Sequence, residues 1–359
     1  MSVKLKKVVT IAPLLFMPAH SNLSTVLGQF LLSPRSLRIE QVVSTQAFSG
    51  AQIWRVITDQ ARFCLRRWPE GSDFARLSSI HRVLAHIAQQ GEHCIATPLP
   101  ACDGRTLLFH DQAYWELAPW LPGEVEAKSP VSPIKIENAM RAMAKIHLAA
   151  KSYSGDAQFP ASQVGMPAGL KNRWIKLRWW LETGCEHLLA AKIDPKWNQL
   201  NDLRWFFLER LKSIAPLLGL EIEGATRSVV PLQICLRDVW RANVLFYGDQ
   251  VTGIIDYDAL RIDSVATDVA RLLGSLAGDE PNLWHLGCVA YAEIRPLSEA
   301  ERRLVVCYDR TAVLLTGLQW LEWILLEQRE FANPAAVLER LAETRLRLEQ
   351  LSRRITVDQ

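Results

Sequence analysis

The 359-residue chain has no long apolar run, no internal repeat, no low-complexity segment and little net charge. No stretch approaches the roughly 20 apolar residues that a membrane-spanning helix needs, so we expect no membrane span. A net charge of +3 is too small to indicate a nucleic-acid partner. The ordinary complexity and apolar content also exclude a collagenous, coiled-coil or disordered chain.

Paired cysteines are also lacking. The seven cysteines are an odd number, lie far apart and form no C-x-x-C motif, which argues against a disulfide framework and against a zinc ribbon. The pattern is typical of reduced thiols, and we therefore predict a cytoplasmic location. The cysteines are Cys64, Cys94, Cys102, Cys185, Cys235, Cys288 and Cys307.

What is present is enough apolar sequence, 49% of the residues, to build the core of one large or two modest domains.

The first residues faintly resemble a secretory signal, with lysines before the apolar run 8–18. Pro13 and Pro18 interrupt that run, and no small-residue cleavage site follows it. We expect residues 1–36 to be a flexible leader, or the product of a start codon assigned too far upstream. In either case we expect them to lie outside the fold.

Short β-prone segments surround one helix in the next part of the chain. Apolar residues at helical spacing predict a helix over 72–90, with Ser72 as its N-cap. Residues 37–121 are thus expected to form a small α+β lobe. Its strands are predicted over 37–43, 52–57, 62–68, 105–110 and 113–118.

Residues 122–359 show mainly helical patterns, with a β-rich island at 229–257. Most of the 13 tryptophans lie at helical spacing, which indicates core packing rather than ligand stacking. We expect this larger, mainly helical lobe to hold a catalytic loop and an acceptor site.

Three side chains in the β-rich island suit phosphoryl transfer. Asp238 precedes Asn243 by five positions, Asn243 opens an apolar strand, and a tight turn leads back along a second apolar strand to Asp256. A hairpin of that length returns Asp256 to the end of the sheet where Asn243 begins. Amide and carboxylate oxygens are ligands that Mg²⁺ prefers, and the remaining aspartate can accept a proton from an attacking hydroxyl group. The alternative is that all three lie on ordinary hairpin turns.

This segment resembles the aminoglycoside phosphotransferase and choline kinase-like group, relatives of the protein kinases. The family segment reads H-G-D-x-x-x-x-N-hydrophobic, followed by hydrophobic-hydrophobic-D-hydrophobic, and the resemblance extends from about residue 37 to about residue 276. It implies a bilobal protein kinase-like fold, in which Asp238 is the catalytic base and Asn243 and Asp256 hold magnesium. Asp268, in the family's D-L-A-like helix start, is implied to brace the catalytic loop by hydrogen bonds.

The resemblance also implies an ATP site in the small lobe. Its phosphate loop would lie at Ser49 and Gly50, and Arg66 stands where the family commonly has a phosphate-contacting lysine. An arginine can still neutralise phosphate, through a planar fork rather than a point charge. The segment Pro119, Trp120 and Leu121 resembles the hinge whose backbone groups meet adenine.

The chain departs from the family pattern at three places. Leu236 and Arg237 replace the His and Gly before the catalytic aspartate, the phosphate loop keeps only Gly50, and the helix glutamate that usually pairs with the phosphate-contacting cation has no clear match near Ile80–Arg82. These departures leave two hypotheses. One is an ATP- and Mg²⁺-dependent kinase that phosphorylates a hydroxyl group of a small molecule, and the other is a degenerate kinase-like nucleotide-binding or regulatory module.

The larger lobe is rich in tryptophan and arginine and has no acidic run of the kind that a polycationic aminoglycoside would favour. We therefore expect a neutral, amphiphilic or anionic acceptor. The sequence does not indicate the oligomeric state.

Overall fold

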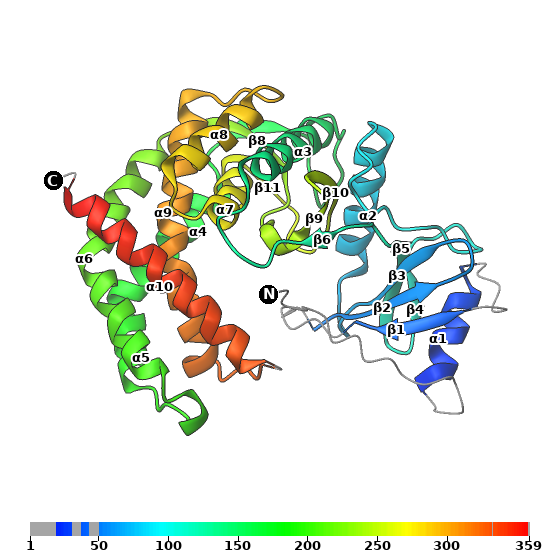
Figure 1. Cartoon of the computed structure of the whole chain (residues 1–359), viewed down its shortest axis with the longest axis horizontal. Helices are drawn as coiled ribbons and strands as arrows, with labels where there is room; N and C mark the ends of the chain where they lie inside the picture. Colours follow the sequence, from blue (N-terminus) through cyan, green and yellow to red (C-terminus); the bar gives the residue numbers. More distant parts are fainter. Residues whose placement is uncertain (1–18, 31–36, 43–49, 332, 358–359) are drawn as a thin grey trace.

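The computed structural model describes residues 19–30, 37–42, 50–331 and 333–357 (Figure 1). The predicted α+β order, a small β-rich lobe followed by a mainly helical one, is confirmed. The strands are β1 (Arg38–Gln41), β2 (Gln52–Ile57), β3 (Arg62–Arg67), β4 (Leu108–His110), β5 (Ala113–Pro119), β6 (Glu124–Val125), β7 (Gln163–Gly165), β8 (Val230–Cys235), β9 (Val244–Tyr247), β10 (Gln250–Ile254) and β11 (Arg261–Asp263). The α-helices are α1 (Ala19–Gly28), α2 (Phe74–Gln89), α3 (Pro133–Lys151), α4 (Ala168–Trp179), α5 (Cys185–Ala190), α6 (Leu200–Thr226), α7 (Ala266–Ala277), α8 (Pro281–Ala292), α9 (Glu299–Leu321) and α10 (Pro334–Val357).

The small lobe is built on an antiparallel sheet with the strand order β1-β2-β3-β5-β4, and helix α2 follows β3 in the chain. The N-cap of helix α2 lies one residue later than expected. The carboxylate of Asp73 accepts a hydrogen bond of 2.8 Å from the Ala75 amide and so caps the helix, whereas the Ser72 hydroxyl donates to the Pro69 carbonyl. The prediction of Ser72 as N-cap is therefore wrong, because its hydroxyl closes the preceding turn instead.

Part of the segment that we expected to lie outside the fold packs into the small lobe. Helix α1 and the residues after it bury Leu23, Val26, Leu27 and Phe30 in one apolar cluster with the sheet. Apolar burial of this kind stabilises by about 25 cal/mol per Å² removed from water. Residues 1–18 and 31–36 lie outside the described residues.

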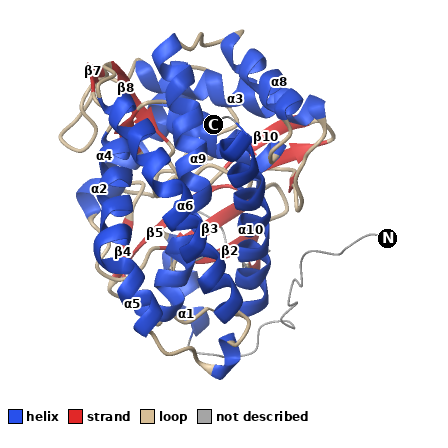
Figure 2. Cartoon of the chain, turned by 90° about the vertical axis from the view of Figure 1, so that its left-hand side faces the viewer, coloured by secondary structure: helices blue, strands red, loops and turns tan. Residues whose placement is uncertain are grey.

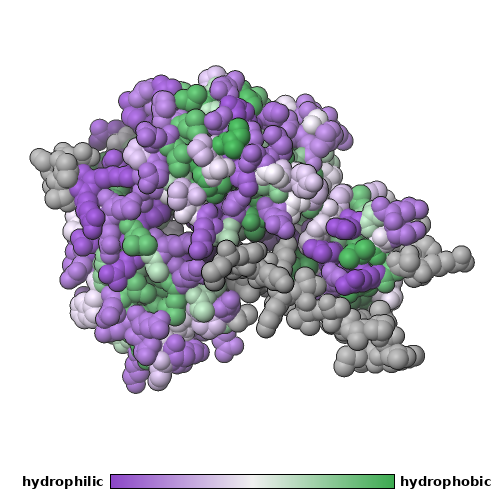
Figure 3. Space-filling view, in the orientation of Figure 1, coloured by the Kyte–Doolittle hydropathy of each residue, from purple (hydrophilic) through white to green (hydrophobic). Residues whose placement is uncertain are grey.

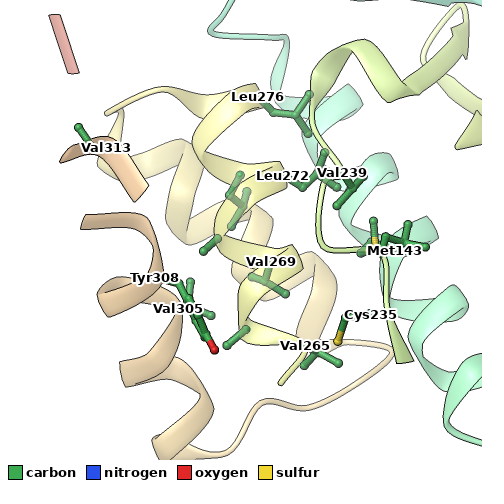
Figure 4. Packing of buried hydrophobic residues seen from close by; sticks show 14 of the residues in the cluster. Met143, Cys235, Val239, Val265, Val269, Leu272, Leu276, Val305, Tyr308 and Val313 are labelled. Atoms are coloured by element: carbon green, nitrogen blue, oxygen red, sulfur yellow. The ribbon is translucent and has the colours of Figure 1, made fainter. Parts of the chain in front are cut away.

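In the larger lobe, α7 packs against α3, α8 and α9. Helices α4, α6, α9 and α10 run alongside one another (Figure 2), and α9 packs on α7. Val269 and Leu272 of α7 are fully buried, as is its N-cap residue Val265, and Figure 4 shows α7 between α9 and the chain around Cys235. All residues of α7 except Arg271 and Ser275 are buried, as expected for a helix packed on nearly all sides.

The β-rich island divides between two small sheets. Strands β9 and β10 form the predicted hairpin, which pairs with β6, whereas β8 pairs with β7 and β11. The loop that carries Asp238 therefore runs from one sheet to the other.

The connection between the lobes lies against this hairpin. The Thr252 hydroxyl donates to the Pro122 carbonyl at 2.5 Å, and a Cβ atom on Gly123, whose φ is +106°, would lie 2.8 Å from the Phe246 carbonyl oxygen. Only glycine fits that close approach and that backbone angle. The proposed boundary between residues 121 and 122 falls at this contact and remains a prediction.

Figure 3 shows a mostly hydrophilic face with smaller hydrophobic areas. Among the described helices, none has the length and apolar character needed to cross a bilayer. All seven cysteines are free thiols.

Candidate active site

Asp238 lies in the loop between β8 and β9, with its side chain 58% exposed. Arg271 of α7 donates a hydrogen bond of 2.9 Å to its carboxylate. The neighbouring Val239 is buried near Leu272 and Leu276 of α7 (Figure 4). A buried anchor beside an exposed carboxylate fixes the loop while leaving Asp238 accessible.

The backbone before Asp238 is held by Asp268 at the start of α7. The Asp268 carboxylate accepts hydrogen bonds from the amides of Leu236, at 2.6 Å, and Arg237, at 2.7 Å. It also lies 3.1 Å from Nε2 of the buried His147, whose Nδ1 lies 2.7 Å from the Tyr291 hydroxyl. Asp268 thus has the bracing position that the family resemblance implies, and the loop is held although Leu236 offers no side-chain hydrogen bond.

Arg237 stands at the position of the glycine in the family motif and has the backbone conformation that glycine favours. Its φ is +71°, in the left-handed region that favours glycine. The Arg237 guanidinium forms an ion pair with the fully buried Asp263, which also accepts hydrogen bonds from the Gly169 amide and the Tyr308 hydroxyl. This ion pair ties the strained residue to the core of the larger lobe.

The hairpin brings Asn243 and Asp256 together as predicted. Val244 pairs with Ile254, and the Asn243 side-chain nitrogen donates to the Ile255 carbonyl at 3.1 Å. Because its nitrogen is used in this way, the oxygen of the Asn243 amide is the atom left for a cation. Asp256 follows directly, with φ +72° and a carboxylate that is 48% exposed. Two hard oxygen donors of this kind fit a divalent cation such as Mg²⁺.

Arg66 of β3 reaches across to the chain after the hairpin. Its guanidinium lies 2.6 Å from the Asp258 carboxylate, 3.7 Å from that of Asp256 and 3.9 Å from that of Glu116. Burial raises the pKa of Asp258 to about 6, although the charge of Arg66 acts in the opposite direction. The four residues Arg66, Glu116, Asp256 and Asp258, which we call the Arg66 cluster, link the two lobes and contain one cation and three carboxyl groups.

Glu116 is a residue that the sequence analysis missed. It pairs directly with Arg66 across strands β5 and β3, and it accepts hydrogen bonds at 2.7 Å from His81 of α2 and at 2.9 Å from Trp68. Burial acts to raise the pKa of Glu116, but the hydrogen bond with His81 and the charge of Arg66 outweigh it and lower that pKa. Glu116 thus supplies, from a strand, the acidic partner that we could not find on the helix.

The predicted nucleotide-binding residues are only partly described. Ser49 lies outside the described residues, and Gly50, with φ +73°, stands just before β2 at the end of the sheet where Gln52 pairs with Arg67. At the hinge, Pro119 ends β5, the Trp120 ring lies 4.3 Å below the Arg55 guanidinium, and a Cβ atom on Gly253 would lie 2.7 Å from the Leu121 side chain. The hinge therefore lies directly against the hairpin of Asn243 and Asp256.

A sequence model of the phosphotransferase enzyme family (APH) matches residues 46–303. The chain belongs to this family. The match covers the Arg66 cluster, the hinge, the loop of Asp238 and the hairpin. The chain is also similar to two proteins named homoserine kinase. The one from Methylocella silvestris is 30% identical over 123 residues, which are 33% of this chain and only 38% of that protein, and the one from Rhodopseudomonas palustris is 25% identical over 273 residues, 73% of each.

The kinase-like fold is also that of a solved phosphotransferase. The structure of spectinomycin phosphotransferase in complex with ADP and spectinomycin superposes with a TM-score of 0.65 at 13% sequence identity, covering 92% of this chain and 93% of that one. The predicted family and bilobal fold are confirmed. So is the predicted class of enzyme, a small-molecule kinase with a hydroxyl group as acceptor.

Proposed function

We propose that the protein transfers the γ-phosphoryl group of ATP to a hydroxyl group of a small molecule, with Mg²⁺ as the divalent cation. The observation that carries the proposal is the hairpin that joins Asn243 to Asp256 beside Arg66. Transfer between two oxygen atoms depends on positioning and charge neutralisation and needs no covalent protein nucleophile. The described residues offer both.

Asp238 is the proposed base. Its exposed carboxylate orients the acceptor hydroxyl and takes its proton as the acceptor oxygen bonds to the γ-phosphorus and the bond to the β–γ bridging oxygen of ATP breaks, which releases ADP. Arg271 holds the Asp238 carboxylate in place by a hydrogen bond of 2.9 Å.

Asn243 and Asp256 are the proposed ligands of Mg²⁺, through the amide oxygen and the carboxylate. When bound there, the cation neutralises charge on the nucleotide phosphates. Arg66 is the proposed phosphate contact of the small lobe, and Ser49 and Gly50 the proposed phosphate loop. The backbone of Pro119, Trp120 and Leu121 is proposed to meet adenine, which agrees with the ADP named in the spectinomycin phosphotransferase complex. The free thiols agree with a cytoplasmic location, which we also propose.

The two relatives named homoserine kinase make a hydroxy amino acid the first acceptor to assay. Among the described residues of the site, nothing favours the degenerate alternative, because Glu116 and Asp268 provide two of the contacts whose absence motivated it.

The test is Asp238→Asn, which keeps the size of the side chain and removes its charge. We expect phosphoryl transfer, followed as ADP release over an acceptor panel, to fall at least about 100-fold. The variant should still be stabilised against heating by ATP with Mg²⁺, because ligand binding to the folded state alone raises its stability.

The matched control is Asp249→Asn, in the exposed turn of the same hairpin, which should leave transfer unchanged. Full activity of Asp238→Asn, or no stabilisation of the natural protein by any nucleotide with Mg²⁺, would contradict the proposed function.

A further inference from the structure

A second polar site is formed in part by the loop of Asp238. It is a pocket of about 130 Å³ whose walls are the loop itself, α7, α9 and α10. This volume is below the roughly 300–1,000 Å³ of sites for drug-sized ligands. Its lining includes Trp240, Arg241, Arg271, Trp320, Arg340 and Glu343, and we call it the acceptor pocket.

The acceptor pocket adjoins the proposed base through Arg271. That residue lines the pocket and donates to the Asp238 carboxylate at 2.9 Å. Asp238 itself is not a lining residue, so Arg271 is the link between the pocket and the proposed base.

Positive charge is concentrated where the loop meets α10. Arg241 donates two hydrogen bonds, of 2.8 and 2.9 Å, to the carboxylate of Glu343. Arg340 lies farther from that same carboxylate, at 3.9 Å. Its guanidinium stacks on the Trp240 ring, 3.4 Å from the ring centre. Two arginines thus face one carboxylate, which leaves a local excess of one positive charge.

Arg340 is unfavourably placed without an anion. Burial lowers the pKa of Arg340 to about 10, the charges of Arg241 and Arg271 act in the same direction, and those of Glu343 and Asp238 oppose it. An anionic group bound in the pocket would relieve this repulsion. Since Trp240 fixes the plane of the guanidinium, the fork of Arg340 is already oriented for a planar carboxylate.

We propose that the acceptor pocket binds the phosphoryl acceptor through a carboxylate group that Arg340 recognises, while Asp238 faces the acceptor hydroxyl. This inference rests on the proposed function. Arg340, Glu343 and Trp320 lie outside residues 46–303, the part of the chain that the family model matches, so the selectivity would belong to this chain rather than to the shared part.

The experiment compares short aliphatic hydroxy acids and hydroxy amino acids with their primary amides, which have the same shape and no charge. We expect the best acid to exceed its amide at least about tenfold in kcat/KM. Arg340→Met should raise KM for that acid roughly 10- to 100-fold, with a smaller change in kcat, and should bring acid and amide close to equality.

Arg340→Lys serves as a second variant, because it keeps the charge and should retain part of the preference. The control is Arg353→Gln, an exposed arginine of the same helix, which should change neither constant. Equal use of acids and amides by the natural protein, a preference for amines, a preference for glycerol 3-phosphate over the carboxylates, or an equal loss for acid and amide in Arg340→Met would each overturn the inference.

Failure of the proposed function gives a different result. If ATP with Mg²⁺ stabilises the protein and Asp238→Asn abolishes transfer, but acids and amides are equivalent, only the inference on the carboxylate is wrong. If no transfer occurs, yet a hydroxy acid binds with Arg340-dependent affinity in calorimetry, the carboxylate site is supported and the proposed function is wrong.

Discussion

The Arg66 cluster and the acceptor pocket have opposite charge balances. In the Arg66 cluster, three carboxyl groups surround one guanidinium. In the acceptor pocket, Arg241 and Arg340 share the carboxylate of Glu343. The first arrangement is completed by a cation and the second by an anion. The difference teaches that each side is electrostatically balanced only when its own ligand is bound.

The largest expected effect concerns the cation side. Asp256→Ala removes the only proposed ligand with a full charge, and transfer should fall about 100-fold or more. Addition of a chelator to the natural protein should have the same effect, reversed by added Mg²⁺. Both are measured as ADP release, together with heat stability in the presence of ATP.

For this variant, Asp249→Asn is again the control, because it lies at the opposite end of the same hairpin. Unchanged activity in Asp256→Ala, or activity that survives chelation, would contradict the proposed cation site.

An intermediate effect is expected at Arg66. Arg66→Met deletes the proposed phosphate contact, and KM for ATP should rise about 10- to 100-fold, the size of a lost charged hydrogen bond. Because the change also leaves Glu116 and Asp258 without their cation, Arg66→Lys is measured beside it and should lose less. Arg62→Met, at the exposed start of the same strand, should behave like the natural protein. An unchanged KM for ATP in Arg66→Met would show that Arg66 serves only to join the lobes.

The smallest effect is expected at Glu343. Glu343→Gln removes the one carboxylate that faces Arg241 and Arg340, so the positive charge of the acceptor pocket increases. KM for a carboxylate acceptor should fall roughly two- to fivefold, as for a partly exposed charge pair. KM for the matched amide should stay the same. A rise in KM for the acid would indicate that Glu343 is needed to hold Arg241 in place.

The hairpin was predictable because its evidence is local. The spacing from Asn243 to Asp256, with a Gly-Asp turn between two apolar strands, predicts a hairpin, and the structure has that hairpin. A bulge between Val251 and Gly253, which the spacing does not indicate, shifts its register. The bracing by Asp268 was also expected, although from the family resemblance rather than from the spacing.

Other features depend on contacts between distant segments. Glu116 lies 50 positions from Arg66 in the sequence, and Arg271 lies 33 positions from Asp238, so no local pattern marks either pair. Helix α1 was placed outside the fold because its charged and proline-interrupted flanks hid the few apolar residues that it buries. Arg340 stood among interleaved arginines and glutamates, where the sequence alone does not tell a pocket-lining residue from a solvated one.

Helix α10 has a consequence for how this protein can change. It meets the catalytic loop through the stacking of Arg340 on Trp240 and the pairing of Glu343 with Arg241, yet it comes about 100 positions later in the chain. Exchange of this terminal segment could therefore give the enzyme a new choice of molecule to phosphorylate, while the machinery that handles the nucleotide is inherited intact.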